Sequence, residues 1–307
     1  MTSAPVERVP RVSVVIPNFH GGDLLRDAVR SVQAQTLTDW ELLIVCDGPC
    51  DDLTDVERSE PRVRVFRQRN RGASIARNVG IRHARSALIA LLDDDDRMLP
   101  DRLAAQVAVM DDTSIGLCHT QCRLINEHGT VIGEGAGRES QYNDFLRGDG
   151  AILLSSTMVR KELVEDVGGF NPLLPLGEDL DFLYRLARES AFRFLPEVLT
   201  EYRVHGANTW AGSAKGGAEV TSILTQHLFV ARARAEHEHV AAINHGLSLI
   251  PSDRVAQAML RAHDARARRR YAAMIVALAM AMVCAPVFTL KAVRRAVRKL
   301  ARPSAVS

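Results

Sequence analysis

The sequence lacks the features that mark several specialised classes of protein. It has only five cysteines, an odd number in a chain of 307 residues, and no two of them have the C-x-x-C spacing of a usual zinc site. We therefore expect no disulfide framework and a reducing compartment. Cys118, His119 and Cys122 share the apolar stretch 115–122, which predicts a buried strand rather than a metal site. Residues 1–11 hold no apolar segment, so we expect no signal peptide and a protein that starts in the cytoplasm.

Extremes of composition are also absent. Apolar residues make up 47% of the chain and charged residues 25%, which excludes the disordered, collagen-like and multi-span membrane classes. The net charge is only +2, but residues 261–302 carry eleven Lys or Arg and one Asp, which leaves the rest of the chain at −8. This asymmetry argues against a nucleic-acid groove in the body and favours an anionic partner at the tail.

The pattern of residues 12–92 alternates between β-branched runs and segments with helical spacing of apolar residues. Strands are predicted at 12–16, 41–45, 62–66 and 87–92, and helices after Gly21-Gly22-Asp23, at 51–57 and at 73–84. Alternation of this kind is typical of βαβ units with a parallel sheet. Residues 12–16, apart from Ser13, and residues 88–92 are apolar, as central strands covered on both faces should be. The expected fold class is therefore α/β.

The pattern after Pro100 is less regular. We expect a helix from Pro100 to about residue 110, a strand at 115–122, a hairpin at 126–132 with Gly129 in its turn, a helix at 178–187 and strands at 192–194 and 198–203. A loop at 206–217 ends this domain, and from residue 218 the sequence predicts helices rich in Ala and Arg.

Polar residues directly follow three of the predicted strands: Pro17-Asn18, Asp47-Gly48 and Asp93 to Asp96. Ligands of parallel sheets bind beyond the carboxyl ends of the strands, so these residues are expected along one binding edge. Four adjacent carboxylates repel one another unless a cation compensates them, and Mg²⁺ or Mn²⁺ is the natural choice. The alternative for this run is a solvated acidic loop before a helix N-terminus.

A set of motifs then resembles the family 2 glycosyltransferases in order and spacing over about residues 11–210. The motifs are Val12 to Phe19, Ser31 to Thr36, Trp40 to Gly48, Asn70 to Gly80, Leu92 to Asp101, Val167 to Asn171, Gly177 to Asp181 and Tyr202 to His205. The resemblance implies a GT-A, Rossmann-like domain with a mostly parallel central sheet, followed by a helical C-terminal region. It further implies a nucleotide-diphosphate sugar donor, a divalent metal and inversion at the anomeric carbon.

The resemblance also assigns roles to individual residues. Asp95 falls on the metal-ligand aspartate of the Asp-x-Asp motif, Asp93 on its first member, Asp47 on the aspartate that reads the nucleotide base, and Asp179 on the catalytic base. The expected nucleotide-sugar-binding set is Pro17, Asn18, Asp47, Arg77, Asp93 and Asp94, and the expected metal set is Asp95 and His205. The chain departs from the family where Asn18 replaces a common Thr or Ser and where Cys46 precedes Asp47.

Three of these assignments have plainer alternatives. Glu178 and Asp179 would equally well complement the positive end of a helix dipole. Arg77 would also fit as an exposed helix arginine, and His205 as an ordinary loop histidine.

The tail contains an uncharged run at 271–290 that would measure about 30 Å as a helix, marginally enough to span a bilayer. Residues 291–302 then follow the pattern of a basic amphipathic helix suited to an anionic leaflet. The alternative for the helical region 218–303 is a dimerisation or packing domain with a solvated basic face.

Together these features predict a cytoplasmic, metal-dependent inverting glycosyltransferase, peripheral on the inner face of the cell membrane. It would move a sugar to a hydroxyl of a glycan or lipid-linked acceptor, in the synthesis of a cell-surface polysaccharide or glycoconjugate. No nucleic-acid partner is expected, and homo-oligomerisation is left open. A nucleotidyltransferase is the nearest rival, but residues 17–22 lack the lysine of its phosphate loop. A non-catalytic scaffold that binds sugar nucleotide is the alternative from another class.

Overall fold

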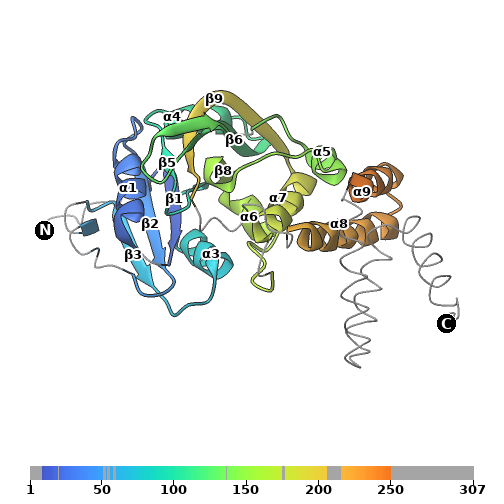
Figure 1. The fold of residues 1–307 in the computed structure, drawn as a ribbon, viewed down its shortest axis with the longest axis horizontal. Coiled ribbons are helices and arrows are strands. Elements are labelled where there is room, and N and C mark those ends of the chain that lie inside the picture. Colours follow the sequence, from blue (N-terminus) through green and yellow to red (C-terminus); the bar gives the residue numbers. More distant parts are fainter. Residues whose placement is uncertain are drawn as a thin grey trace, which may run out of the picture. The chain divides into compact units, whose positions relative to one another are not determined.

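The computed structural model describes residues 9–19, 21–50, 53, 56–57, 60–135, 137–174, 177–205 and 216–249 (Figure 1). The chain divides into two compact units. The first contains residues 1–145 and 150–211, and the second contains residues 146–149 and 212–307.

Strands and helices alternate along the first unit. Its strands are β1 (Val12–Asn18), β2 (Trp40–Cys46), β3 (Val63–Arg67), β4 (Leu88–Leu91), β5 (Arg97–Met98), β6 (Ile115–Ile125), β7 (Val131–Glu134), β8 (Thr157–Arg160) and β9 (Ala191–Arg203). The helices that accompany them are α1 (Gly22–Gln33), α3 (Ala73–His83), α4 (Arg102–Met110), α5 (Tyr142–Arg147), the 3₁₀ turn η1 (Leu154–Ser156), α6 (Lys161–Asp166) and α7 (Glu178–Glu189).

The strands of the described residues form one sheet in the order β3-β2-β1-β4-β8-β6-β9-β5, with β7 paired to β6. The half that contains β3, β2, β1 and β4 is parallel throughout. In the other half β8 runs antiparallel to both β4 and β6, and β9 runs parallel to β6. The predicted α/β class is therefore confirmed, with a Rossmann-like parallel half and a mixed second half.

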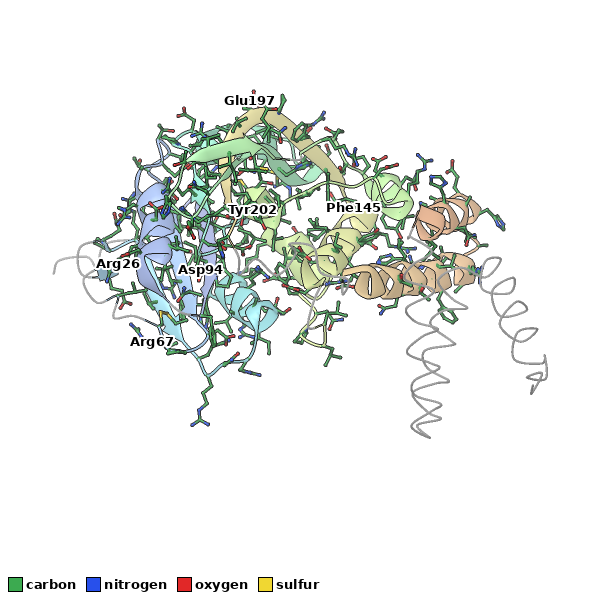
Figure 2. The ribbon with its side chains drawn as sticks, viewed as in Figure 1. Arg26, Arg67, Asp94, Phe145, Glu197 and Tyr202 are labelled. Carbon is green, nitrogen blue, oxygen red and sulfur yellow. A yellow bond between two sulfur atoms is a disulfide. The ribbon has the colours of Figure 1, made fainter. Side chains whose placement is uncertain are left out.

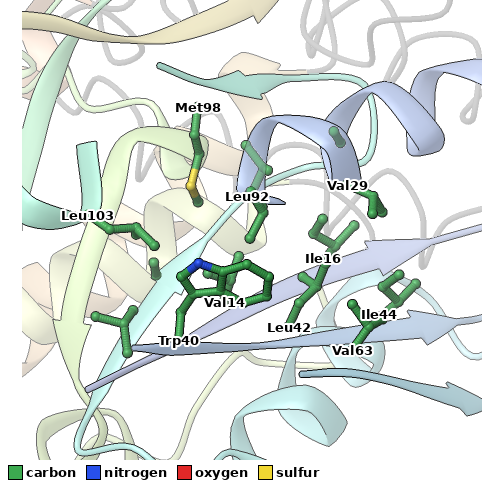
Figure 3. Packing of buried hydrophobic residues seen from close by; sticks show 14 of the residues in the cluster. Val14, Ile16, Val29, Trp40, Leu42, Ile44, Val63, Leu92, Met98 and Leu103 are labelled. Atoms are coloured by element: carbon green, nitrogen blue, oxygen red, sulfur yellow. The ribbon is translucent and has the colours of Figure 1, made fainter. Parts of the chain in front are cut away.

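The parallel half is rigid because its central strands are apolar on both faces. Every residue of β1 and of β2 is buried. On one face the two strands pack against α1, whose Val29 is labelled in Figure 3. The helix buries Leu25, Ala28, Val29 and Val32, which have the i, i+3, i+4, i+7 spacing of an amphipathic helix that faces a core. Helix α3 approaches β1 closely at Gly80, where an added Cβ would lie 2.5 Å from a methyl group of Val15.

Most predicted elements are confirmed with shifts of a few residues at their ends. The turn at Gly129 is also confirmed, with a φ of 83° and a hydrogen bond from its N–H to the carbonyl of Asn126. The two strands predicted at 192–194 and 198–203 form one strand, β9, whose register against β6 shifts around Gln121. The sequence pattern missed β5, α5, β8 and α6, which have at most six residues each. The helix predicted at 51–57 lies mostly outside the described residues.

In the second unit the structure describes α8 (Gly216–Ala233) and α9 (His237–Leu249), which contact each other. No helix among the described residues is both long and apolar enough to cross a bilayer. The apolar run 271–290 and the basic segment 291–302 lie outside the described residues.

Candidate active site

The candidate site lies where β1, β2 and β4 end. Asn18 closes β1, and its carbonyl oxygen accepts a hydrogen bond of 2.7 Å from the backbone N–H of Asp47, which follows β2. The Asn18 side-chain amide in turn donates to Asp94, which follows β4 and is labelled in Figure 2. Pro17 is buried within β1 and pairs in register with Val45. The structure thus brings the predicted residues of three strand ends to one edge of the sheet.

The carboxylates after β4 lie in an environment that opposes their ionisation. Burial, with the neighbouring charges of Asp95 and Asp93, raises the pKa of Asp94 to about 6. Burial and Asp93 also raise the pKa of Asp95. Asp96 is fully buried, and burial raises its pKa well above the usual range of a carboxyl. A cation bound at this loop would relieve that cost, because opposite charge favours the ionised form.

The two expected metal ligands are in contact, since Nε2 of His205 lies 2.8 Å from Oδ2 of Asp95. A carboxylate suits Mg²⁺ or Mn²⁺, whereas an imidazole nitrogen suits a transition metal better than Mg²⁺. No group of three or more His, Cys, Asp or Glu side chains in the described part of the chain forms a metal cluster. Such a two-ligand site needs further oxygens, which the phosphates of a substrate can supply.

Arg203 organises the loop that carries these ligands, a role that sequence reasoning missed although the residue lies in the Tyr202 to His205 motif. Its backbone N–H donates to Oδ1 of Asp96 at 2.8 Å, and its Nε donates to the carbonyl oxygen of Asp95 at 2.7 Å. Its Nη2 forms an ion pair of 2.8 Å with Asp27 of α1. Because the side chain is 1% exposed, these contacts are shielded from water, and β9 and α1 together fix the loop.

Tyr202, labelled in Figure 2, is a second residue that sequence reasoning left without a role. Burial, together with the carboxylates of Asp96, Asp95, Asp93 and Asp179, raises the pKa of its phenol to about 12. The phenol is therefore protonated at neutral pH, and it lies within electrostatic range of both the carboxylates after β4 and the start of α7.

Helix α7 begins with three carboxylates whose surroundings differ. Gly177 caps it in the left-handed conformation, with a φ of 75°, which glycine adopts without strain. Glu178 forms an ion pair with Arg77 at 3.1 Å, and Asp181 forms one with Arg185 at 2.6 Å. Asp179 accepts a hydrogen bond from the N–H of Leu180, and burial together with Glu178 raises its pKa. Of the three, Asp179 is therefore the carboxylate best suited to take up a proton.

Arg77 is buried rather than an exposed helix arginine, since only 7% of it is accessible. Its Nη2 lies 2.7 Å from Oδ1 of Asp93, and its Nη1 lies 3.1 Å from Oε1 of Glu178. The guanidinium also lies over the ring of Phe170 at 5.3 Å. Both terminal nitrogens of Arg77, which the expected contact with the donor would use, thus bind carboxylates of the protein.

Asp47 also has protein partners that the sequence did not indicate. Its Oδ1 accepts hydrogen bonds from the Gln68 side chain at 2.6 Å and from the N–H of Arg71 at 2.8 Å, while Oδ2 accepts one from the N–H of Gly72 at 2.6 Å. These bonds hold the segment that leads into α3. A carboxylate offers about four acceptor positions, so one position stays available to a ligand.

The expectation that the cysteines form no disulfide is wrong for one pair. Cys46 and Cys50 are joined by a disulfide that encloses Asp47. Their Cα atoms lie 5.7 Å apart because the chain turns sharply after β2, within the range that a disulfide can bridge. Cys118 and Cys122 are free and buried in β6. His119, which lies between these two cysteines in the sequence, is also buried and has no hydrogen-bond partner among the described residues. Burial lowers its pKa to about 4.

Comparisons with known proteins agree with this architecture. An uncharacterized glycosyltransferase from Rickettsia conorii is 35% identical over 237 residues, which cover 72% of this chain and 38% of the relative. A chondroitin synthase from Escherichia coli is 29% identical over 214 residues, 67% of this chain and 31% of the relative. The chain therefore spans about a third of the length of these two relatives. TuaG of Bacillus subtilis, whose name assigns it to teichuronic acid biosynthesis, is 28% identical over 67% of this chain and 85% of its own length.

The fold is similar to that of a solved structure of S. aureus TarS, residues 1–349, with a TM-score of 0.56 over 89% of this chain and 90% of TarS at 16% identity. This likeness supports a GT-A fold. A TarS structure in complex with UDP-GlcNAc matches with the same TM-score. The model of the family described as "Glycosyl transferase family 2" matches residues 13–167, half of the chain. The protein whose strand ends carry this site therefore belongs to glycosyltransferase family 2.

Proposed function

We propose that the protein transfers a sugar from a nucleotide-diphosphate sugar to an acceptor hydroxyl, with a divalent metal and with inversion at the anomeric carbon. One observation carries the proposal. Asp95 contacts His205, and Asp179 at the start of α7 lies near enough to Asp93 for the two carboxylates to interact, in a chain of the glycosyltransferase family. The first pair would hold the cation that stabilises a leaving diphosphate, and Asp179 would supply a base.

Asp95 and His205 would hold the metal, Mn²⁺ in preference to Mg²⁺. When bound, the metal neutralises the negative charge that develops on the leaving nucleoside diphosphate. The rest of the chain would position the side chains of Asp95 and His205 for that metal. Arg203, the last residue of β9, holds the backbone of Asp95, and His205 follows it two residues later.

Asp179 would remove the proton of the acceptor hydroxyl as that oxygen attacks the anomeric carbon. Its carboxylate is buried and its pKa is raised, so the ionised form is a stronger base than an exposed aspartate. The electron pair of the broken sugar–oxygen bond goes to the diphosphate, and the proton goes to Asp179. One displacement from the face opposite the leaving group gives inversion.

Asp47, Asn18 and Pro17 would line the nucleotide subsite, with Asp93 and Asp94 facing the diphosphate and sugar. Asn18 supports Asp94 through its side-chain amide and accepts a hydrogen bond from the N–H of Gly21 at 3.0 Å. The TarS complexes with UDP and with UDP-GlcNAc make uridine nucleotides the first donors to test. The chondroitin synthase and TuaG names favour a growing polysaccharide as acceptor.

A panel of nucleotide sugars tests the activity directly. The full chain is incubated with each donor and with Mn²⁺, Mg²⁺ or a chelator, and release of nucleoside diphosphate is followed with and without oligosaccharide acceptors. We expect metal-dependent release from one donor class, faster with an acceptor and faster in Mn²⁺ than in Mg²⁺. Metal-dependent binding of donors with no release under any condition would favour the non-catalytic scaffold.

We also propose a cytoplasmic protein held peripherally at the inner membrane face by residues 261–302, whose charge of +10 suits anionic lipid. A reducing cytoplasm would keep Cys46 and Cys50 as thiols, so the state of this pair in protein isolated under alkylating conditions tests the location. The membrane contact is tested with anionic vesicles and the full chain in which Arg294, Arg295 and Arg298 are replaced by Glu. Binding should weaken in this variant but not when Arg232 and Arg234 are replaced by Glu. A tail variant that binds vesicles normally would contradict the proposal.

A further inference from the structure

Helix α3 contacts the start of α7 and the segment before it through two adjacent side chains. Arg77 reaches Glu178, and Asn78 forms a pair of hydrogen bonds with the backbone of Phe170, both of 2.8 Å. The ring of Phe170 stacks on that of Phe182 in α7, with centroids 3.9 Å apart. The segment before α7 comes so near that a Cβ on Gly169 would lie 2.6 Å from Oδ1 of Asn78. Helix α3 and the first two turns of α7 therefore form one packed unit.

Arg77 connects this unit to the carboxylate loop after β4. Its two terminal nitrogens are divided between Asp93 and Glu178, which belong to segments 85 residues apart in the sequence. Buried, charge-assisted hydrogen bonds of this kind are strong and directional. Glu178 is followed directly by Asp179, so the position of the guanidinium also sets where the base lies relative to Asp93.

We propose that Arg77 is a positioning residue that holds Asp179 at a set distance from the donor subsite by bridging Asp93 and Glu178, rather than a residue that contacts the donor. The inference rests on the proposed function of the site. It differs from the donor-contact role expected for Arg77, because one N–H of each terminal nitrogen binds a carboxylate of the protein.

A conservative substitution separates the two roles. In Arg77→Lys the positive charge remains, but one ammonium cannot occupy two nitrogen positions on separate carboxylates. If Arg77 positions the base, turnover falls while the donor still binds through its other partners. A displacement of about 1 Å in a reacting group costs about a hundredfold in rate. If Arg77 instead contacted the diphosphate, the variant would weaken donor binding.

The experiment measures kcat and the donor dissociation constant of the full chain for wild type, Arg77→Lys, Glu178→Gln and the double variant, with the donor identified by the panel. We expect kcat to fall about 30- to 100-fold in each single variant, with the donor dissociation constant within about threefold of wild type. The double variant should lose hardly more than either single one, because both remove the same bridge.

In the described part of the chain Arg185 pairs with Asp181, another first-turn carboxylate of α7, and donates to the carbonyl oxygens of Val167 and Gly169, but it forms no ion pair with Asp93. Arg185→Lys is therefore the matched control. It should keep kcat within about threefold of wild type. An equal loss in Arg185→Lys, or a loss of donor affinity in Arg77→Lys with kcat unchanged, would overturn the inference.

Hydrogen–deuterium exchange of the full chain tests the bridge without turnover. Arg77→Lys and Glu178→Gln should both speed exchange of backbone amides at the start of α7, and unchanged protection there would overturn the inference. A wild-type protein that transfers no sugar would instead refute the proposed function, while this exchange measurement still decides on the bridge.

Discussion

Replacement of Asp179 by Asn is the sharpest test of the proposed chemistry. Oδ1 of Asp179 accepts a hydrogen bond of 2.8 Å from the N–H of Leu180, and the amide oxygen of Asn can accept the same bond. Glu178 and Asp181 still complement the helix N-terminus, so the lost charge costs about 0.3–1 kcal/mol of stability at most. The fold should therefore be retained, and any loss of activity can be assigned to the lost base.

The expected effect on rate follows from the role of a base. A positioned general base contributes about 10²–10⁴-fold, which corresponds to about 2.7–5.4 kcal/mol in the activation free energy. The amide of Asn cannot accept the proton, so kcat should fall by at least about a hundredfold. The donor dissociation constant should change little, because the base acts in the transition state rather than in donor binding.

The assay is steady-state transfer with the panel donor, together with donor calorimetry and thermal unfolding of each variant. Glu162→Gln is the matched control, since it removes a first-turn carboxylate from α6, away from the strand-end carboxylates. It should leave kcat and stability near wild type. Turnover of Asp179→Asn within about threefold of wild type would refute the assignment of the base.

Further changes at the site should separate the roles of its residues. Asp95→Asn should abolish the metal dependence of donor binding in calorimetry, because the amide has the shape of the carboxylate but not the charge that holds the cation. The control Asp112→Asn, on the surface, should leave the metal dependence of donor binding unchanged. Asp47→Ala should raise the donor KM about tenfold or more, and it should also speed hydrogen exchange at residues 71–72, whose N–H groups lose their acceptor. In the kcat–pH profile, kcat should fall on the acid side with a midpoint above the usual pKa of Asp, because Asp179 must be ionised and burial, Glu178 and Asp93 raise its pKa. Arg77→Gln should move that midpoint to higher pH, because Arg77 lowers the pKa of Asp179. A midpoint near pH 4 in both proteins would contradict the base assignment.

The parallel half of the sheet could be predicted from the sequence because its information is local. Residues 12–16, apolar except for Ser13, and residues 88–92 are typical of central strands, and strand ends in parallel sheets share one edge. That rule alone brings Asn18, Asp47 and the carboxylates after β4 together. The ordered motifs added the family and the identity of the expected base.

The mixed half of the sheet was harder to predict from the pattern. β5 has two residues and β8 has four, which are too few to show a period in the sequence. The sequence pattern predicts two strands in place of β9, which is continuous but shifts its register against β6. These strands form because neighbours that are distant in sequence offer backbone partners. Local propensity therefore carried little of the information that specified them.

The sequence by itself determined the class of fold, the edge that carries the site and the residue types that gather there. Only the tertiary structure decided how those residues divide their contacts. Arg77 turns inward to bridge two carboxylates, Asp47 binds the loop before α3, and Arg203 holds the backbone of Asp95. The physical reason is that hydrogen bonds and ion pairs in a buried site depend on distances of a few tenths of an ångström between segments far apart in the chain, and no local pattern encodes those distances.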